Sequence, residues 1–383
     1  MSINIAVLKE TQPGEKRVAS VPVVAPKLSK LGATLTLERD AGAAATFPDA
    51  AFGQVAFAAS AAEAVAAADV VLAVQPPPVQ TIRAMQPGAV LVSFLHAESA
   101  PDRVQALCEA KVTVLAMERI PRISRAQSMD ALSSQAALAG YYAPLLGAVH
   151  MPRILPMMTT AVGSLRAAKV LVMGLGVAGL SALATARRLG AVTEGYDVRP
   201  ETREQAQSLG ARFVDTGVDA RGEGGYAREL TDEEKARVRA ALSQHIAAAD
   251  MIVTTAAVPG RRAPRLIDAE QLAAMKPGSV VVDLGAEGGG NCEGTVPGQT
   301  VTLGNATVIG PLNVPSLLAQ HASELYAKNV ANLLELIVKD GALALDFGDE
   351  VVAGTTLIHA GQVRDEALRA RLQSTAPATG AAP

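Results

Sequence analysis

Short apolar runs rich in β-branched residues recur along the chain, and segments with a helix-like spacing of apolar positions separate them. This alternation is typical of a parallel sheet with helices on both faces. The first set of runs covers residues 3–8, 31–38, 69–75, 89–95 and 112–117, and the second covers residues 169–174, 192–198, 211–215, 250–256, 279–285 and 306–310. We therefore predict an α/β protein made of two Rossmann-like, doubly wound parallel-sheet domains.

Two longer helical segments interrupt this alternation, at residues 131–149 and 313–341. The second has a Pro-Ser start, a helical apolar period and an Asp-Gly stop. We expect the chain to cross between the domains through one helix and to return through the other. The predicted domains are residues 1–132 with 335–373, residues 133–334 including the connecting helices, and a disordered tail of small and proline residues at 374–383.

Composition and charge narrow the possible functions. A formal net charge of −3 gives no broad basic field, which argues against nucleic-acid binding. Cys108 and Cys292 lack CxxC spacing and neighbouring histidines, so we predict neither a disulfide scaffold nor a metal site. The first residues do not read as a signal peptide, and Glu63 and Asp69 interrupt the most apolar stretch. We expect a cytoplasmic protein with no membrane span.

A glycine-rich turn is the strongest chemical signal. An apolar strand at residues 170–173 runs into the spacing GxGxxG, and a helical segment follows. In such a turn the first glycine allows the tight bend, the second lets the backbone approach a pyrophosphate, and the third allows close helix packing. We assign dinucleotide binding to Gly174, Gly176, Val177, Ala178 and Gly179. The alternative is a doubly wound domain that has lost its ligand.

The next predicted strand ends at Asp197, a little over twenty residues after the first glycine. A carboxylate at this position accepts hydrogen bonds from ribose hydroxyls and repels a 2′-phosphate. We therefore predict NAD(H) as the cofactor, bound in part by Asp197, Val198 and Arg199. The positive charge of Arg199 leaves NADP(H) open as an alternative.

A long segment at residues 216–234 carries many charges and three glycines before helical spacing resumes. Long irregular insertions in compact domains are usually functional or disordered. Two readings stay open from these residues: a solvated surface loop, or a lid that folds over bound nucleotide with Tyr226 as its large contact group.

Polar residues gather in the segment RISRAQSMDALSSQ at residues 122–135. A helix that served packing alone would place apolar residues every three or four positions, and here they are sparse. The segment contains two arginines, two glutamines, an aspartate and several serines. This density of polar groups indicates a role other than packing.

Several motifs together resemble one family. PRISRAQSMDALSSQ, the glycine turn, YDVR, GEGGYAREL, KPGSVVVDL, GGNC and NVPS are similar to the NAD(H)-binding component, domain I, of proton-translocating NAD(P) transhydrogenase. The resemblance covers nearly the whole chain and implies a homodimer of two-domain protomers. It further implies a separate alpha-1 subunit, peripheral on the cytoplasmic face of the membrane. That subunit passes hydride between NADH and NADP(H) held by a beta subunit, while a membrane-spanning alpha-2 subunit takes part in proton translocation.

The same resemblance implies roles for particular residues. The groups that would hold the nicotinamide carboxamide and ribose, and so serve transfer, are Arg122, Gln127, Asp130 and Ser133. The glycine turn would bind the pyrophosphate, and Asp197 with Arg199 the adenosine ribose. Gly225 and Tyr226 match the family's mobile loop, which favours the lid reading. Leu317 departs from the expected basic residue after NVPS, so any contact of that residue is in doubt.

Two alternatives of other kinds remain. Alanine dehydrogenase shares the two-domain plan, and Arg17 and His96 match its substrate-binding arginine and catalytic histidine. That family expects a lysine near residues 73–75, where this chain has none. A non-enzymatic NAD(H) sensor is the second alternative, although it would have no need of polar groups around the nicotinamide.

Overall fold

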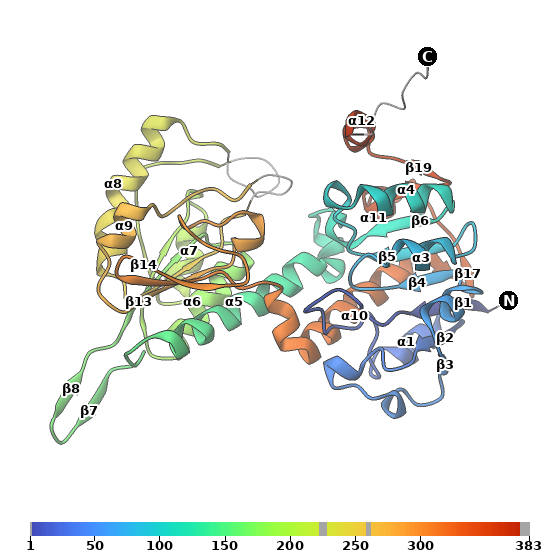
Figure 1. The fold of residues 1–383 in the computed structure, drawn as a ribbon, viewed down its shortest axis with the longest axis horizontal. Helices are drawn as coiled ribbons and strands as arrows, with labels where there is room; N and C mark the ends of the chain where they lie inside the picture. The colour runs from blue at the N-terminus through green and yellow to red at the C-terminus, as the bar shows by residue number, and fades with distance from the viewer. Residues whose placement is uncertain (1, 222–227, 258–261, 376–383) are drawn as a thin grey trace, which may run out of the picture. The chain divides into compact units, whose positions relative to one another are not determined.

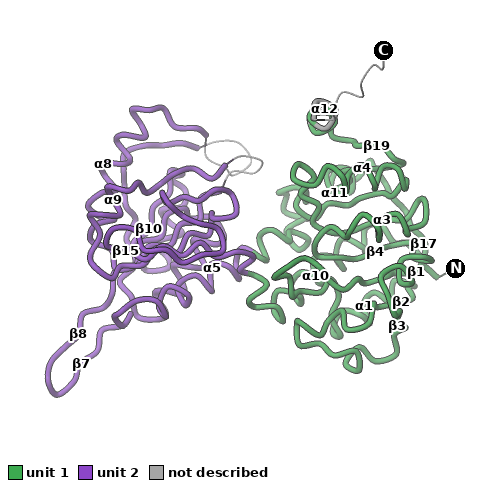
Figure 2. The backbone as a smooth tube through the Cα atoms, viewed as in Figure 1, with its two compact units in different colours: residues 1–135, 315–383 green, residues 136–314 purple. Residues whose placement is uncertain are grey.

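The computed structural model describes residues 2–221, 228–257 and 262–375. The chain forms two compact units: unit 1 contains residues 1–135 and 315–383, and unit 2 contains residues 136–314 (Figure 2). The sequence placed the second boundary at residue 334, whereas the observed boundary lies at 314. Helix α10 (Ala319–Ile337) accounts for the difference, because its buried side chains belong to a core of unit 1.

Unit 1 is built on a mostly parallel sheet with the strand order β19-β18-β6-β5-β4-β1-β2-β3 (Figure 1). Strands β1 to β6 pair in parallel, and β18 and β19 add an antiparallel edge. The strands are β1 (Ile3–Val7), β2 (Ala33–Glu38), β3 (Ala56–Ala58), β4 (Val70–Leu72), β5 (Val90–Ser93), β6 (Thr113–Ala116), β18 (Thr356–His359) and β19 (Gln362–Val363). The strand order reverses at β1, as in a doubly wound fold.

Both faces of this sheet are covered. Along β1, Ile5 and Val7 enter one apolar core, while Ala6 and Leu8 enter the other, as the two-residue period of a strand requires. The first core is completed by α1 (Ala25–Lys30), α10 and α11 (Glu350–Thr355), and the second by α2 (Ala61–Val65), α3 (Val79–Arg83), α4 (Pro101–Glu109) and α12 (Glu366–Thr375). A short ribbon of β16 (Val338–Lys339) and β17 (Ala342–Leu343) follows α10.

Unit 2 repeats the plan with the strand order β11-β10-β9-β12-β13-β15-β14. All neighbours pair in parallel except β14 and β15. The strands are β9 (Lys169–Met173), β10 (Val192–Tyr196), β11 (Arg212–Phe213), β12 (Met251–Thr254), β13 (Ser279–Asp283), β14 (Thr300–Leu303) and β15 (Ala306–Ile309). Here the order reverses at β9, the strand that leads into the glycine turn.

Helices cover both faces of this second sheet as well. Val170 and Val172 of β9 pack on one face, and Leu171 and Met173 on the other. One face carries α5 (Ala131–His150), α6 (Val177–Arg188) and α7 (Thr202–Ser208), and the other carries α8 (Asp232–Ala248) and α9 (Ala269–Ala273). Helix α8 begins with a capping box, in which Thr231 and Glu234 satisfy each other's backbone N–H groups.

These observations confirm the predicted fold class, with antiparallel strands at three sheet edges as an addition. Helix α5 starts in unit 1 and continues into unit 2. The expected tail begins at residue 374, but α12 extends to Thr375, and residues 376–383 lie outside the described residues. No helix within the described ranges has the length and apolar character needed to cross a membrane.

Candidate functional site

The glycine turn of unit 2 follows β9 directly. Gly174 has φ +95°, a left-handed conformation that favours glycine, and a Cβ atom there would lie 2.8 Å from Thr255 Oγ1. A Cβ atom at Gly179 would lie only 1.8 Å from the carbonyl oxygen of Gly174, so α6 reaches this turn only with glycine at that position. A Cβ atom at Gly176 would meet no protein atom within 4 Å. The three glycines therefore play three different structural roles.

The start of α6 fits a bound pyrophosphate. Gly176 is the N-cap residue and supplies no side-chain cap, and the first turn of the helix contains no acidic residue. The first backbone N–H groups of a helix have no partner within the helix and attract negative charge. Val177 is 44% exposed beside this end. The backbone of Ala178 packs against α5, where a Cβ atom at Gly140 would lie 2.0 Å from its carbonyl oxygen.

Asp197 does more than the sequence predicts. Its carboxylate accepts hydrogen bonds from the backbone N–H of Leu175 (2.7 Å) and from the backbone N–H, Nε and NH2 groups of Arg199 (2.8 to 2.9 Å). The aspartate therefore holds the glycine turn in place and occupies the guanidinium of Arg199. Val198 lies between them, partly buried, and its carbonyl accepts from the Ala220 N–H. The Arg199 charge is thus neutralised by Asp197, which weakens its attraction for a 2′-phosphate.

We predict that Asp197→Asn lowers the preference for NADH over NADPH by roughly tenfold, or about 1.4 kcal/mol. The change removes the charge that repels a 2′-phosphate and releases Arg199 to contact that phosphate. Calorimetric titration with both nucleotides would give the ratio of dissociation constants. Glu201→Gln removes an exposed carboxylate nearby and serves as the control for net charge. Equal NADH and NADPH affinities in the unmodified protein would contradict the assignment.

A buried carboxylate that the sequence analysis did not single out organises the neighbouring loops. Asp283, at the end of β13, has no exposed surface and accepts hydrogen bonds from five groups, which are Thr254 Oγ1, Thr295 Oγ1 and the backbone N–H groups of Gly285, Asn291 and Cys292. The Asn291 amide in turn donates to the Ala256 carbonyl (2.8 Å). An aspartate at the end of an otherwise apolar strand was the signal available in the sequence.

The polar segment singled out in the sequence lies in unit 1. It forms a 3₁₀ helix, η5 (Ser124–Met129), followed by the first turn of α5. Arg122 and Gln127 are exposed, whereas Asp130 and Ser133 are half-buried. Asp130 accepts from the Ser133 N–H (2.8 Å) and from the Ser133 hydroxyl (2.6 Å), so this pair also caps α5.

Other polar members of the segment have structural partners. Arg125 forms a two-point pair with Asp349, which caps α11. Gln135 is buried, accepts from Arg17 NH1 (2.9 Å) and donates to the Ala322 carbonyl (3.1 Å). The polar density therefore has two causes, since some side chains fasten the segment and others are exposed.

The arginine that resembles a substrate-binding residue is enclosed. Arg17 is only 4% exposed, and its Nε and NH2 groups donate to the two carboxylate oxygens of Glu15 at 2.8 and 2.6 Å. Gln75, in place of the lysine that alanine dehydrogenases would need, donates to the same carboxylate (3.0 Å). Burial opposes the charge of Glu15, but hydrogen bonds from Arg17 outweigh it and lower the Glu15 pKa to about 2. This arrangement leaves Arg17 unavailable to a substrate carboxylate.

The other residue of that alternative, His96, is exposed and lies in the left-handed region with φ 48°. Its backbone N–H donates to Glu118 (2.8 Å), which also accepts from Leu95, and its ring stacks on Phe94. These contacts give the backbone conformation a structural explanation.

Glu10 gives a prediction about pH. Burial, with a further contribution from the Glu15 charge, raises the Glu10 pKa to about 8, although the Val74 and Gln75 N–H groups donate to its carboxylate. A raised folded-state pKa means that stability is lost as pH rises from about 4.5 to about 8, by at most about 1.4 kcal/mol per pH unit. Melting temperatures between pH 5 and 8.5 should fall less steeply for Glu10→Gln. Parallel curves for the two proteins would contradict this.

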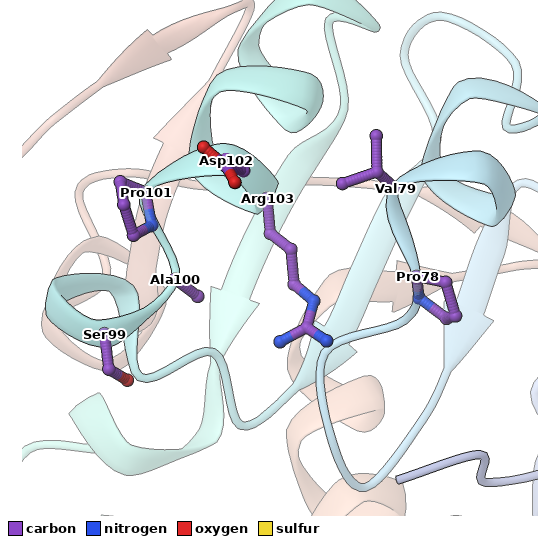
Figure 3. A pocket seen from close by; sticks show the side chains of 7 residues that line it. All are labelled: Pro78, Val79, Ser99, Ala100, Pro101, Asp102 and Arg103. Atoms are coloured by element: carbon purple, nitrogen blue, oxygen red, sulfur yellow. The ribbon is translucent and has the colours of Figure 1, made fainter. Parts of the chain in front are cut away.

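A hollow at the surface of unit 1 lies between the starts of α3 and α4 (Figure 3). Its lining is Pro78, Val79, Ser99, Ala100, Pro101, Asp102 and Arg103, none of which is a predicted site residue. Gly225 and Tyr226 lie outside the described residues. Across the part of the chain that the structure describes, no three His, Cys, Asp or Glu side chains gather in a group that could hold a metal.

The doubly wound sheet and its glycine turn place the chain in the class of NAD-binding, Rossmann-type oxidoreductases. Family comparisons agree: the model "Alanine dehydrogenase/PNT, N-terminal domain" matches residues 6–139, and "Alanine dehydrogenase/PNT, C-terminal domain" matches residues 143–366. The chain belongs to this alanine dehydrogenase/PNT family.

Within the family, the chain is similar to transhydrogenase subunits. It is 44% identical to the first part of the divided NAD(P) transhydrogenase subunit alpha of Rhodospirillum rubrum, over 96% of this chain and 99% of that protein. The crystal structure of transhydrogenase from Sinorhizobium meliloti matches with a TM-score of 0.84 and 42% identity, over 95% and 99% of the two chains. Alanine dehydrogenase of Mycobacterium tuberculosis (strain ATCC 25618 / H37Rv) is 27% identical over 77% of this chain and 76% of its own. The resemblance stated from the sequence is confirmed, with alanine dehydrogenase as a distant relative.

Proposed function

We propose that this chain is the NAD(H)-binding subunit of a proton-translocating NAD(P) transhydrogenase, which passes a hydride directly between NADH and NADP⁺ held by a partner subunit. The observation that carries the proposal is the exposed polar segment around Arg122 and Gln127, fastened from beneath, in a chain whose glycine turn fits a pyrophosphate. The similarity to transhydrogenase alpha subunits supports it.

In this proposal the protein contributes positioning. NADH supplies the hydride, and transfer between two nicotinamide rings requires neither a protein nucleophile nor a proton donor. Arg122 and Gln127 offer exposed hydrogen-bonding groups for the carboxamide and ribose, and the Asp130 and Ser133 pair fixes the orientation of these groups. Holding two reactants in a near-attack geometry lowers the barrier by several kcal/mol.

The other parts of the reaction are assigned to partner subunits. We propose an NADP(H)-binding beta subunit and a membrane-spanning alpha-2 subunit that takes part in proton translocation, with this chain peripheral on the cytoplasmic face of the membrane. The Rhodospirillum rubrum relative is named as only the first part of its subunit alpha, which supports a divided alpha subunit. NADP(H) would bind to the partner rather than here, in keeping with the negative charge of Asp197.

The test is reconstitution from purified components. NADH and an NADP analogue are mixed with this chain alone, with the NADP-binding component alone, and with both. We expect transfer only when both proteins are present. NADH binding without transfer in the complete mixture would contradict the proposal and would direct attention to an alanine oxidation assay and to the sensor alternative.

We further propose a homodimer, supported by the hairpin of β7 (Met158–Thr160) and β8 (Gly163–Leu165). The hairpin projects from unit 2 (Figure 1), and its two strands pair only with each other among the described residues. Met157 is 71% exposed and Val162 is 98% exposed. An isolated two-stranded hairpin with apolar side chains is marginally stable in water, so a second copy of the chain is its expected cover.

Val162→Asp is expected to convert the dimer to a monomer by placing a charge in the apolar contact. Sedimentation velocity at micromolar concentration would measure the change in mass. Val23→Asp makes the same substitution at an exposed position of unit 1 and should leave the mass unchanged. A monomeric unmodified protein, or a Val162→Asp dimer of unchanged affinity, would contradict the assignment of the hairpin.

A further inference from the structure

Asn329 is a buried polar residue in the middle of α10, where apolar side chains pack into the core of unit 1. It is only 6% exposed. A primary amide in such a position costs free energy unless hydrogen bonds satisfy it. The partners of this amide therefore indicate why an asparagine stands there.

The amide bridges two points of the polar segment. Its Nδ2 group donates to the carbonyl of Ser128 (2.9 Å), and its Oδ1 atom accepts from the hydroxyl of Ser134 (2.7 Å). The Ser128 carbonyl can only accept, which fixes the orientation of the amide. Ser128 and Ser134 lie on either side of Asp130 and Ser133 in the chain, so one buried side chain holds both ends of the proposed nicotinamide-binding segment.

Asn332, nearly one turn further along α10, provides a natural comparison. Its Nδ2 group also donates to the Ser128 carbonyl (3.0 Å), and its Oδ1 atom accepts from Lys27 Nζ (2.7 Å). It is partly exposed, and neither of these hydrogen bonds reaches Ser134. Removing Asn332 would therefore weaken one end of the segment without breaking the bridge.

We propose that Asn329 is a positioning residue for hydride transfer: its amide sets the spacing between Ser128 and Ser134 and thereby the orientation of Gln127, Asp130 and Ser133. The proposal rests on the function assigned above. Misplacement of reacting groups by about 1 Å can slow a reaction roughly 100-fold even when the altered residue is distant. Loss of the bridge should therefore affect transfer more than nucleotide binding.

The experiment compares Asn329→Ala, Asn329→Asp, Ser134→Ala and Asn332→Ala. Asn329→Asp keeps the shape but opposes a carboxylate oxygen to the Ser128 carbonyl. Two quantities are measured: amide hydrogen exchange of residues 124–135 in the chain alone, and the single-turnover transfer rate at saturating NADH with the partner. We expect both Asn329 variants to exchange faster in this segment and to transfer roughly 10- to 100-fold more slowly, with the NADH dissociation constant within about threefold.

Ser134→Ala should give a smaller effect that is not additive with Asn329→Ala, and Asn332→Ala should resemble the unmodified protein. Unchanged exchange in residues 124–135 of Asn329→Ala would overturn the proposal. So would a transfer rate that falls only in parallel with NADH affinity, because a general loss of structure explains that result. If the unmodified protein transfers no hydride, the assigned function and the proposed role in transfer both fail. The exchange data then separately decide whether Asn329 holds the segment.

Discussion

Alanine at Gly176 or Gly179 is expected to weaken NADH binding by roughly 100-fold, for two different physical reasons. At Gly179 the added Cβ atom would lie 1.8 Å from the Gly174 carbonyl oxygen, so the turn must move away from the helix. At Gly176 the Cβ atom meets no protein atom, but it occupies the space through which the pyrophosphate approaches the backbone. Gly179→Ala should therefore also lower the melting temperature, whereas Gly176→Ala should not.

Fluorescence titration with NADH and thermal unfolding would measure these two effects. Gly217→Ala is a control in the same unit: it introduces a methyl group at an exposed glycine with no atom within 4 Å of the added Cβ. Its positive φ predicts a small loss of stability with unchanged NADH affinity. Unaltered NADH binding by both Gly176→Ala and Gly179→Ala would show that the dinucleotide does not bind at this turn.

The second large effect is expected at Asp130. Asp130→Asn should slow hydride transfer by roughly 100-fold while changing the NADH dissociation constant by less than about threefold. The asparagine oxygen can still accept from the Ser133 N–H, so the start of α5 is retained. The negative charge, and its hydrogen bond from the Ser133 hydroxyl, are lost.

Asp130→Ala is the companion variant, because it removes the helix cap as well and should lower the melting temperature. Gln127→Asn retracts an exposed amide by one methylene and should also slow transfer. Single-turnover transfer at saturating NADH and NADP analogue is the measurement. Unchanged transfer in Asp130→Asn and Gln127→Asn would remove the catalytic assignment of this segment.

Periodicity was enough to predict much of this molecule. Apolar runs bounded by turns predicted both parallel sheets, since strands buried on both faces leave a continuous apolar signature. The GxGxxG spacing after a strand predicted the turn, because few other residues fit its close contacts, as Gly174 and Gly179 show. The boundary in the second long helix was missed, because helical spacing reveals that a face is buried but not against which unit α10 packs.

The roles of polar residues were harder to predict, because a side chain's partner can lie far away in the sequence. Asp197 was expected to face a ribose, and the structure adds its bonds to Leu175 and Arg199. Gln135 and Arg17 lie 118 positions apart, and no local pattern links them. Asp283 was hidden for the same reason, since its donors are spread over several loops.

Direct transfer between the two nicotinamides is the central claim, and isotope tracing tests it most directly. NADH carrying deuterium at the transferable C4 position is mixed in ordinary water with the NADP analogue, this chain and the NADP-binding component. The account predicts that the deuterium appears at C4 of the reduced analogue, without exchange into solvent, and only when both proteins are present. Reduced analogue without deuterium, or the same transfer with either protein omitted, would contradict it.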